Sequence, residues 1–373
     1  MSALGPDSRF WGVIPAGGVG SRLWPLSRAD RPKFLHDLTG SGVSLLRATW
    51  DRLAAIAGPE RIVVVTGVAH EASVSAQLPE LDPVNMVLEA EPRDSAAAIG
   101  LAAAILHRRD PDAVIGSFAA DHVIQDAELF RAAVAQAVRL AEEGWIATIG
   151  IAPTEPATGF GYSRVGAPLG VEGAPDGRLV AAFVEKPDRE TAEGYLAGGD
   201  YLWNAGMFIA RADRLLEEIA ASRPELHAGL VGLAAAWDDP ARRAEAAARI
   251  WPGLERVAID YAVAEPAAAA GRLAVVPGRF GWDDIGDFAS IARLHADGQE
   301  GELAILGEDA RVVAEGSTGI VVTRTDRIVS LVGVHDIVVV DTDDALLVTT
   351  REHAQRVKDV VDALRLSGRD NVL

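Results

Sequence analysis

The sequence contains no cysteine and only three lysines, Lys33, Lys186 and Lys358, among its 35 basic residues. Without cysteine the chain can form no disulfide, no thiolate metal site and no thiol nucleophile. This composition is compatible with a reducing compartment. Because nearly every positive charge is an arginine, a retained lysine indicates a position that needs a compact point charge.

Long apolar runs and a net positive charge are also missing. No stretch of about 18 uncharged apolar residues occurs, and the first residues lack the basic and apolar regions of a secretory signal. We therefore expect a cytoplasmic protein without a membrane partner. The 373 residues carry 54 acidic and 35 basic side chains, a net charge of −19. Such a charge repels nucleic acid, so a phosphate ligand must be held by a local cluster of cations.

A glycine-rich turn followed by cations lies near the start of the chain, in the segment VIPAGGVGSRLWPLSRADRPKFL at residues 13–35. Val13 and Ile14 are typical of the end of a buried strand. The turn that follows is almost free of side chains, so its backbone N–H groups can approach an anion closely. The cations after it face a single carboxylate, that of Asp30, and are Arg22, Arg28, Arg31 and Lys33. The segment is predicted to hold a triphosphate.

Two common phosphate-binding turns are excluded by the residues that follow the glycines. A P-loop requires a Gly-Lys pair, and the chain has none. The dinucleotide fingerprint requires a third small residue where Leu23 stands. The remaining pattern, Gly-Gly-x-Gly-x-Arg-Leu-x-Pro-Leu with a later Pro-Lys, resembles the signature of the sugar-1-phosphate nucleotidyltransferases. The alternative is a strand-to-helix turn that binds nothing.

Apolar, β-branched runs alternate with alanine-rich helical stretches through the first part of the chain. We therefore predict an α/β fold with a doubly wound, Rossmann-like, mostly parallel sheet. Ligands of such sheets bind at the carboxyl ends of the strands. The predicted strands are 62–66, 84–88, 113–118, 145–151, 178–184, 206–210 and 272–276, and the predicted helices are 45–57, 95–109, 128–143, 212–221, 240–250 and 286–296.

The composition changes after Gly301 to short Val/Ile/Leu strands broken by glycine and aspartate. We predict a catalytic domain over residues 1–298 and a small β-rich, β-helix-like domain with a terminal helix over residues 299–373. The strands expected in the second domain are 311–314, 318–323, 328–332, 336–341 and 345–349, and the apolar face of the terminal helix carries Val357, Val360, Val361 and Leu364.

Two carboxylates are candidate metal ligands. Asp121 follows the apolar run 113–118, and Asp284 belongs to a later Trp-Asp-Asp-Ile-Gly segment. Two oxygen ligands together with substrate phosphates are typical of bound Mg²⁺. The alternative for an aspartate at a strand end is a turn or cap residue. We interpret His122 as a structural hydrogen-bonding residue, because a hard cation prefers oxygen.

A second group of motifs suits a sugar phosphate. Glu185 and Lys186 follow an apolar strand, and Asn204 is one of only three asparagines. An asparagine amide can donate and accept at once, which suits a sugar hydroxyl, although a turn asparagine is the alternative. Gly161 lets the backbone lie against a hexose ring, and Asp260 can accept from hydroxyls or cap the helix that follows.

Over roughly residues 1–290 these motifs resemble the bacterial mannose-1-phosphate guanylyltransferases (GDP-mannose pyrophosphorylases), in the short form without room for a fused isomerase domain. The resemblance implies a GT-A-like nucleotidyltransferase domain, the substrates GTP and mannose 1-phosphate, the cofactor Mg²⁺ and a homodimer. It assigns nucleotide binding to Ala16, Gly17, Gly18, Gly20, Ser21, Arg22, Lys33, Glu91, Arg93, Asp94, Ser95, Ala96, Asp121 and His122. It assigns the sugar phosphate to Gly161, Glu185, Lys186, Asn204 and Asp260, and the metal to Asp121 and Asp284.

The sequence departs from the family pattern at three places. Ala120 stands where the family usually has proline, and Ala205 where it has serine. The segment Asp94-Ser95-Ala96-Ala97 replaces Asn-Thr-Ala-Pro. Because this third departure lies in the base-reading segment, it leaves the nucleotide preference open.

The resemblance implies an in-line attack of the sugar phosphate on the α-phosphorus of the nucleotide. A phosphomonoester loses its second proton near pH 6, so no general base is required. The residues assigned to catalysis are Arg22, Lys33, Asp121, Lys186 and Asp284. Two alternatives stay open: the same chemistry on another hexose or heptose 1-phosphate or nucleotide, and a non-catalytic regulatory subunit that binds a nucleotide sugar.

Overall fold

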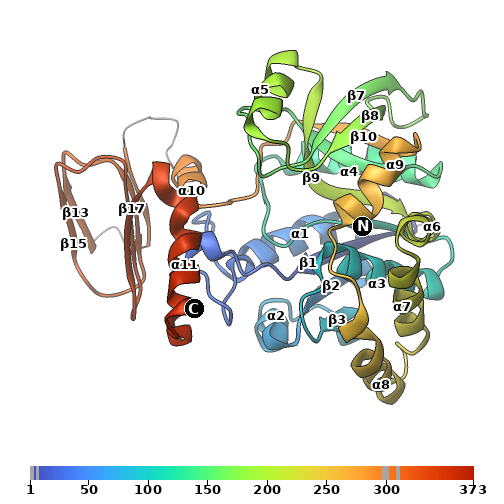
Figure 1. Ribbon diagram of the computed structural model, residues 1–373, viewed down its shortest axis with the longest axis horizontal. Coiled ribbons are helices and arrows are strands. Elements are labelled where there is room, and N and C mark those ends of the chain that lie inside the picture. The colour runs from blue at the N-terminus through green and yellow to red at the C-terminus, as the bar shows by residue number, and fades with distance from the viewer. Residues whose placement is uncertain (1–3, 6–7, 296–301, 308–310) are drawn as a thin grey trace.

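The computed structural model describes residues 4–5, 8–295, 302–307 and 311–373. They form a large α/β body and a smaller β-rich body beside it, with the terminal helix α11 between the β strands and the large body (Figure 1). The predicted boundary between residues 298 and 299 lies outside the described residues. Within the described part, no helix is long and apolar enough to cross a membrane.

A nine-stranded sheet forms the centre of the large body, in the order β3-β2-β1-β4-β9-β6-β10-β8-β7. The predicted α/β class is confirmed, but the sheet is mixed rather than mostly parallel. Strands β3, β2, β1 and β4 are mutually parallel, as are β6 and β10, whereas β9 runs antiparallel to both β4 and β6. The bounds are β1 (Phe10–Ala16), β2 (Ile62–Gly67), β3 (Met86–Glu89), β4 (Val114–Ser117), β6 (Ile146–Ile151), β7 (Tyr162–Pro168), β8 (Arg178–Val184), β9 (Tyr201–Arg211) and β10 (Leu273–Gly278).

Helices cover both faces of this sheet, so the central strands are buried on both sides. On β2, Val63 and Val65 face a core shared with α3, α6, α7 and α9, whereas Val64 faces a core shared with α1, α2 and α4. The helices of the large body are α1 (Leu45–Ala57), α2 (Glu71–Gln77), α3 (Asp94–Arg109), α4 (Ala127–Glu142), α5 (Arg189–Gly198), α6 (Ala212–Ser222), α7 (Pro224–Ala235), α8 (Pro240–Ile250) and α9 (Glu265–Ala269), with a π-helix over Asp260–Ala264 before α9.

Local sequence sets where several helices begin. The side chains of Ser44, Asp126 and Asp188 accept hydrogen bonds from backbone N–H groups in the first turns of α1, α4 and α5. These are the residue types that satisfy the free donors of a helix start. Pro224 and Pro240 occupy the first positions of α7 and α8, where proline removes no helical hydrogen bond.

The smaller body is a short β-helix-like unit. Strands β12, β14 and β16 are parallel, β17 is antiparallel to β16, and β13 pairs with β15 in a second parallel sheet. The predicted β-rich architecture is thus confirmed. The bounds are β12 (Leu303–Leu306), β13 (Val312–Glu315), β14 (Gly319–Thr323), β15 (Val329–Val332), β16 (Ile337–Asp341), β17 (Leu346–Thr350), α10 (Phe288–His295) and α11 (Val357–Leu366).

The segment after the glycine turn is buried against this smaller body. Leu23, Trp24 and Leu26 belong to one apolar cluster with Val357 and Val361 of α11. The Trp24 indole Nε1 donates to the Val372 carbonyl oxygen at 2.6 Å. Burial of these side chains ties the two bodies together.

Arg28 also reaches the smaller body. Its guanidinium pairs with the Asp344 carboxylate at 2.5 and 2.9 Å. The sequence places Arg28 among the cations that follow the glycine turn, but its charge is directed to the interface between the bodies. Arg28 is therefore removed from the cations predicted to hold a phosphate.

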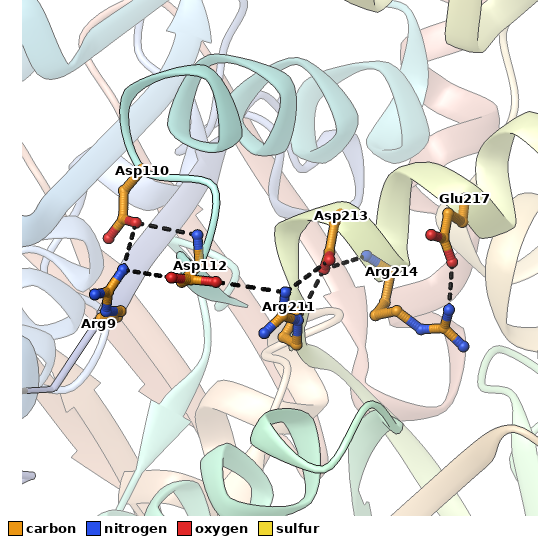
Figure 2. A network of polar contacts seen from close by, with 7 residues as sticks. All are labelled: Arg9, Asp110, Asp112, Arg211, Asp213, Arg214 and Glu217. Atoms are coloured by element: carbon orange, nitrogen blue, oxygen red, sulfur yellow. Dashed lines mark hydrogen bonds and ion pairs between the residues drawn. The ribbon is translucent and has the colours of Figure 1, made fainter.

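A network of ion pairs, shown in Figure 2, joins residues next to the ends of β1, β4 and β9. Arg9, just before β1, pairs with Asp110 at 2.8 Å and Asp112 at 2.9 Å, just before β4. Arg211, at the end of the antiparallel β9, pairs with Asp213 at 2.8 Å and approaches Asp112 at 3.7 Å. Exposed pairs of this kind contribute roughly 0–1 kcal/mol each. The network marks the amino ends of the parallel strands, away from their carboxyl ends.

We expect Trp24→Ala to lower the free energy of unfolding by roughly 3–5 kcal/mol, because it empties a buried aromatic position between the two bodies. The matched control is Asp112→Asn, which should cost no more than about 1 kcal/mol. Urea denaturation of both variants measures the difference. A Trp24→Ala protein as stable as the control would contradict the anchoring role of this interface.

Candidate active site

A two-stranded ladder brings the two candidate metal carboxylates together. The backbone N–H of Ala120 donates to the Pro15 carbonyl, so the chain after β4 continues alongside β1. Just beyond Asp121, β5 (Val123–Ile124) pairs antiparallel with β11 (Trp282–Asp283), which directly precedes Asp284. The ladder therefore fixes positions 121 and 284 near each other at the carboxyl edge of the sheet.

Lys33 joins the two segments. Its Nζ donates to Asp121 Oδ2 at 2.8 Å and also to the backbone oxygen of Asp284. The Lys33 side chain is only 7% exposed. Burial opposes ionisation of Asp121, but the ammonium of Lys33 outweighs it and lowers the pKa of that carboxyl. Burial raises the pKa of Asp284 to about 6, with Lys33 offsetting part of the effect.

The glycine turn is held against Lys33. The Lys33 backbone N–H donates to the Val19 carbonyl at 3.2 Å. Gly20 has φ 75°, and a Cβ there would lie 2.7 Å from Cβ of Lys33, so only glycine fits. Gly17 and Gly18 are exposed, as is Arg22. The turn thus presents free backbone and one exposed cation beside the Lys33 and Asp121 pair.

A cavity of about 240 Å³ opens at this edge of the sheet. Candidate residues from both the nucleotide and the sugar-phosphate groups line it. Its lining includes Ser95, His122, Gly161, Glu185, Asn204, Asp260 and Asp284 together with Ser117, Phe160 and Trp282. One cavity therefore joins the predicted metal site to the predicted sugar site.

Asn204 and Asp260 are hydrogen-bonded at the cavity wall. Asn204 is buried within β9 and is not a turn residue. Its Nδ2 donates to Asp260 Oδ1 at 2.7 Å. Asp260 begins the π-helix without making a side-chain cap, so the capping alternative is wrong. Burial, reinforced by the negative charge of Glu185, raises the pKa of Asp260 to about 7.

Glu185 and Lys186 are the remaining charged pair of the predicted sugar site, and Glu185 lines the cavity. Lys186 Nζ donates to Glu185 Oε1 at 2.5 Å, and the Lys186 side chain is 55% exposed. Glu185 is 4% exposed, and its Oε2 has no hydrogen-bond partner among the described residues. A Cβ on Gly161 would lie 2.4 Å from that oxygen, so a larger residue there would displace the Glu185 carboxylate. Burial disfavours the charge of Lys186, but Glu185 outweighs it and raises the pKa of the lysine.

His122 belongs to an aromatic wall of the cavity. Its ring lies edge-on to Trp282, with centroids 5.3 Å apart, and Phe160 packs on the other side of Trp282. Burial lowers the pKa of His122 to about 4, so the ring is neutral near pH 7. Its Nδ1 has no hydrogen-bond partner among the described residues. The ring packing agrees with a structural role, but among the described residues Nδ1 makes none of the hydrogen bonds expected of that role. The assignment of His122 to the nucleotide stays a prediction.

The residues predicted to read the base, between Glu91 and Ala96, fall into two groups: Glu91 and Arg93 bond to other parts of the chain, whereas Ser95 lines the cavity. Arg93 pairs with Glu91 and donates to the carbonyls of Pro252 at 2.6 Å and Leu254 at 3.1 Å. Ser95 reaches the cavity, although its Oγ also accepts from the Ile259 N–H. The side chains of Glu91 and Arg93 therefore hold the chain that follows α8, and their assignment to the nucleotide stays a prediction.

Glu89 is a candidate that the sequence analysis missed. It ends β3, is 6% exposed and accepts no hydrogen bond from a described residue at its buried Oε1. Its Oε2 would lie 3.8 Å from a Cβ built on Gly17, so the carboxylate faces the glycine turn. Burial, with the nearby Asp94 charge, raises its pKa to about 7. The only sequence signal was a carboxylate ending an apolar strand.

The metal-binding potential of the site rests on carboxylate oxygen. Among the described residues, no group of three or more histidine, aspartate or glutamate side chains is arranged to hold a metal ion alone. Asp121 and Asp284 supply two oxygen donors in one place, and this set fits a hard cation that takes its other ligands from substrate and water.

Comparison with known proteins identifies the class. A model of the nucleotidyl transferase family matches residues 11–301, and a model of the mannose phosphate isomerase/GMP-like β-helix domain matches residues 310–364. The fold and these matches define a nucleotidyltransferase. The chain belongs to the nucleotidyl transferase family, within which it groups with the mannose-1-phosphate guanylyltransferases, as its motifs predict.

Individual relatives match most of the chain. The xanthan biosynthesis protein XanB of Xanthomonas campestris is 39% identical over 381 residues, covering 96% of this chain and 73% of the relative. The mannose-1-phosphate guanylyltransferase of Escherichia coli K12 is 38% identical over 367 residues, covering 97% and 75%. A Thermus thermophilus crystal structure, described as a mannose-1-phosphate geranyltransferase, has a TM-score of 0.83 at 33% identity and covers 96% of this chain and 99% of that one.

We expect Glu89→Gln to stabilise the ligand-free protein at pH 8 by roughly 1–3 kcal/mol. The folded-state pKa of about 7 lies above the ordinary value of 4.5. The folded protein therefore binds more protons than the unfolded chain in this window, so its stability falls as pH rises from about 4.5 to about 7. Urea unfolding at pH 5 and pH 8 measures the effect, with the exposed Glu71→Gln as control. The same pH dependence in the Glu89→Gln and wild-type proteins would refute it.

Proposed function

We propose that the protein converts GTP and α-D-mannose 1-phosphate to GDP-mannose and diphosphate. Membership of the family establishes a nucleotidyltransferase, and the substrates are inferred from relatives that carry this activity in their names. The observation that carries the proposal is that Lys33 bonds to both Asp121 and the Asp284 backbone beside the glycine turn. Asp284 also lines the cavity that holds Asn204 and Asp260. Neither a dehydrogenase nor a simple binding module requires a buried lysine that bonds to two aspartate segments beside a glycine turn.

Asp121 and Asp284 are the residues that would hold Mg²⁺. When bound there, the ion supplies positive charge to the α- and β-phosphates of the nucleotide. Lys33 already pairs with Asp121 through a buried ion pair, so it offsets one of the two negative charges that the site offers to a cation. This arrangement keeps Asp121 ionised over the neutral pH range.

The chain's own residues position two polyanions. The incoming phosphate oxygen is largely ionised above about pH 6 and forms the new bond to the α-phosphorus. The bond from that phosphorus to the β-phosphate oxygen breaks, and diphosphate leaves with the electron pair. Arg22 and Lys33 offset the charge on the leaving group, and Lys186 holds the sugar phosphate.

Glu89 supports guanine as the base. A desolvated carboxylate with an unsatisfied oxygen, as Glu89 has at Oε1 among the described residues, is costly. A ligand that supplies two adjacent donors removes that cost. Among the common bases only guanine presents an N–H and an NH₂ side by side on one edge. Because Glu89 faces the glycine turn, a base held beside the phosphates is within reach of this carboxylate.

Diphosphate release from GTP and mannose 1-phosphate in Mg²⁺ tests the activity. We expect Lys186→Ala to raise the KM for the sugar phosphate roughly tenfold or more, since it removes a charge-assisted contact. Asp284→Asn should lower kcat roughly a hundredfold or more. The exposed Lys358→Ala is the matched control.

Three outcomes would contradict the proposed reaction. Near wild-type turnover of Asp284→Asn would remove the metal assignment. Faster turnover of another hexose or heptose 1-phosphate, or of another nucleotide, would change the substrate. Binding of GDP-mannose by a wild-type protein with no turnover would favour a regulatory subunit.

The choice between Glu89 and Glu91 as the base-reading carboxylate can be measured with ITP, which lacks the 2-amino group of GTP. We expect the wild-type protein to prefer GTP over ITP, and Glu89→Gln to reduce this ratio of kcat/KM values roughly tenfold. Glu91→Gln should leave the ratio unchanged, because that carboxylate pairs with Arg93. Loss of the preference in Glu91→Gln alone would transfer the role to Glu91.

A further inference from the structure

The amide of Asn204 is held in one orientation by donors inside the protein. Its Oδ1 accepts from Thr148 Oγ1 at 2.9 Å and from the Gly206 backbone N–H at 3.2 Å. A backbone N–H can only donate, so the atom that faces it must be the amide oxygen. Both lone pairs of that oxygen are thus used, and only the NH₂ group remains for the cavity.

A strand irregularity creates this arrangement. Between β6 and β9 the register shifts: Thr148 pairs with Phe208, whereas Gly150 pairs with Asn204. The additional residues of β9 include Gly206, which has φ 67°. Bulges next to binding sites commonly redirect a side chain. Here the bulge places the Gly206 N–H and the Thr148 hydroxyl on the same amide oxygen.

We propose that Thr148 is a positioning residue that makes Asn204 a donor-only group in the sugar site. Thr148 is completely buried in β6, behind Asn204 as seen from the cavity. With the oxygen occupied, the amide gives one N–H to Asp260 and has the other for a ligand. The sequence analysis expected this amide both to donate to a sugar hydroxyl and to accept from one. Because its oxygen is already occupied, the expected acceptor role is wrong.

The ligand class follows from this polarity and rests on the proposed function. The sugar must present an acceptor oxygen to the Asn204 amide. Its hydroxyl donors must face the two carboxylates of Asp260 and Glu185, since Glu185 Oε2 has no partner among the described residues. A neighbouring pair of hydroxyls on a pyranose satisfies both demands, because one oxygen accepts while the other donates.

Thr148→Val tests the proposal, because it keeps the side-chain volume and removes the hydroxyl. We expect the KM for mannose 1-phosphate to rise roughly tenfold, with kcat and the KM for GTP changed less than about twofold. Thr148→Ser restores the hydroxyl and should recover most of the affinity. Thr148→Ala should have the same effect as Thr148→Val, and thermal unfolding identifies any variant that fails to fold.

Thr323→Val is the matched control. Thr323 is buried in β14 of the smaller body, and its hydroxyl has no hydrogen-bond partner among the described residues. The same loss of a buried hydroxyl far from the cavity should leave the KM for mannose 1-phosphate unchanged. An effect of the threonine-to-valine exchange itself would appear in both variants, whereas positioning raises the KM only in Thr148→Val; thermal unfolding reports any loss of stability separately.

Calorimetric titration with mannose 1-phosphate separates failure of this inference from failure of the proposed reaction. A wild-type protein without turnover overturns the reaction, while its Kd for the sugar phosphate still compares Thr148→Val with Thr148→Ser. A Kd that rises roughly tenfold in Thr148→Val and recovers in Thr148→Ser supports positioning. Equal KM and Kd values in the wild-type and Thr148→Val proteins overturn it.

Discussion

The short antiparallel ladder between β5 and β11 is the interaction on which the site depends. Each strand has only two residues, Val123–Ile124 and Trp282–Asp283, yet together they bring Asp121 and Asp284 to one edge of the sheet. So short a ladder would not persist by itself. It is held by Lys33, which bonds to both aspartate segments, and by the packing of the Trp282 ring on His122.

The sequence predicted the class of fold, because strong local patterns indicate its strands and helices. The family resemblance led us to expect Asp121 and Asp284 in one place; the structure pairs the strands next to them, and their role as metal ligands stays a prediction. The strands β2, β4, β6, β8 and β10 and the helices α1, α3, α4, α6 and α8 are long apolar or alanine-rich runs. The direction of β9 could not be predicted from these patterns, because a strand buried on both faces has the same composition whether it runs parallel or antiparallel. The short helices α2, α5 and α9 and the π-helix have weak apolar patterns and were missed.

The candidate site shows a similar division. Motif residues such as Lys33, Asn204 and Asp260 could be found from spacing and from the scarcity of lysine and asparagine. Glu89 and Thr148 could not, because a single carboxylate or threonine at the end or centre of a strand is unremarkable in a sequence. Their importance lies in what surrounds them in space: none of the described residues donates to Glu89 Oε1, and an amide oxygen lies beside Thr148.

The burial of Leu23, Trp24 and Leu26 against α11 has a consequence for how this architecture can change. One short stretch of chain carries the glycine turn for which we propose nucleotide binding and, directly after it, the residues that pack on the neighbouring body. The two bodies cannot be exchanged between homologues as independent modules, because a chimaera would pair this stretch with a foreign surface. Any exchange that preserves activity must carry the matching contact residues with it.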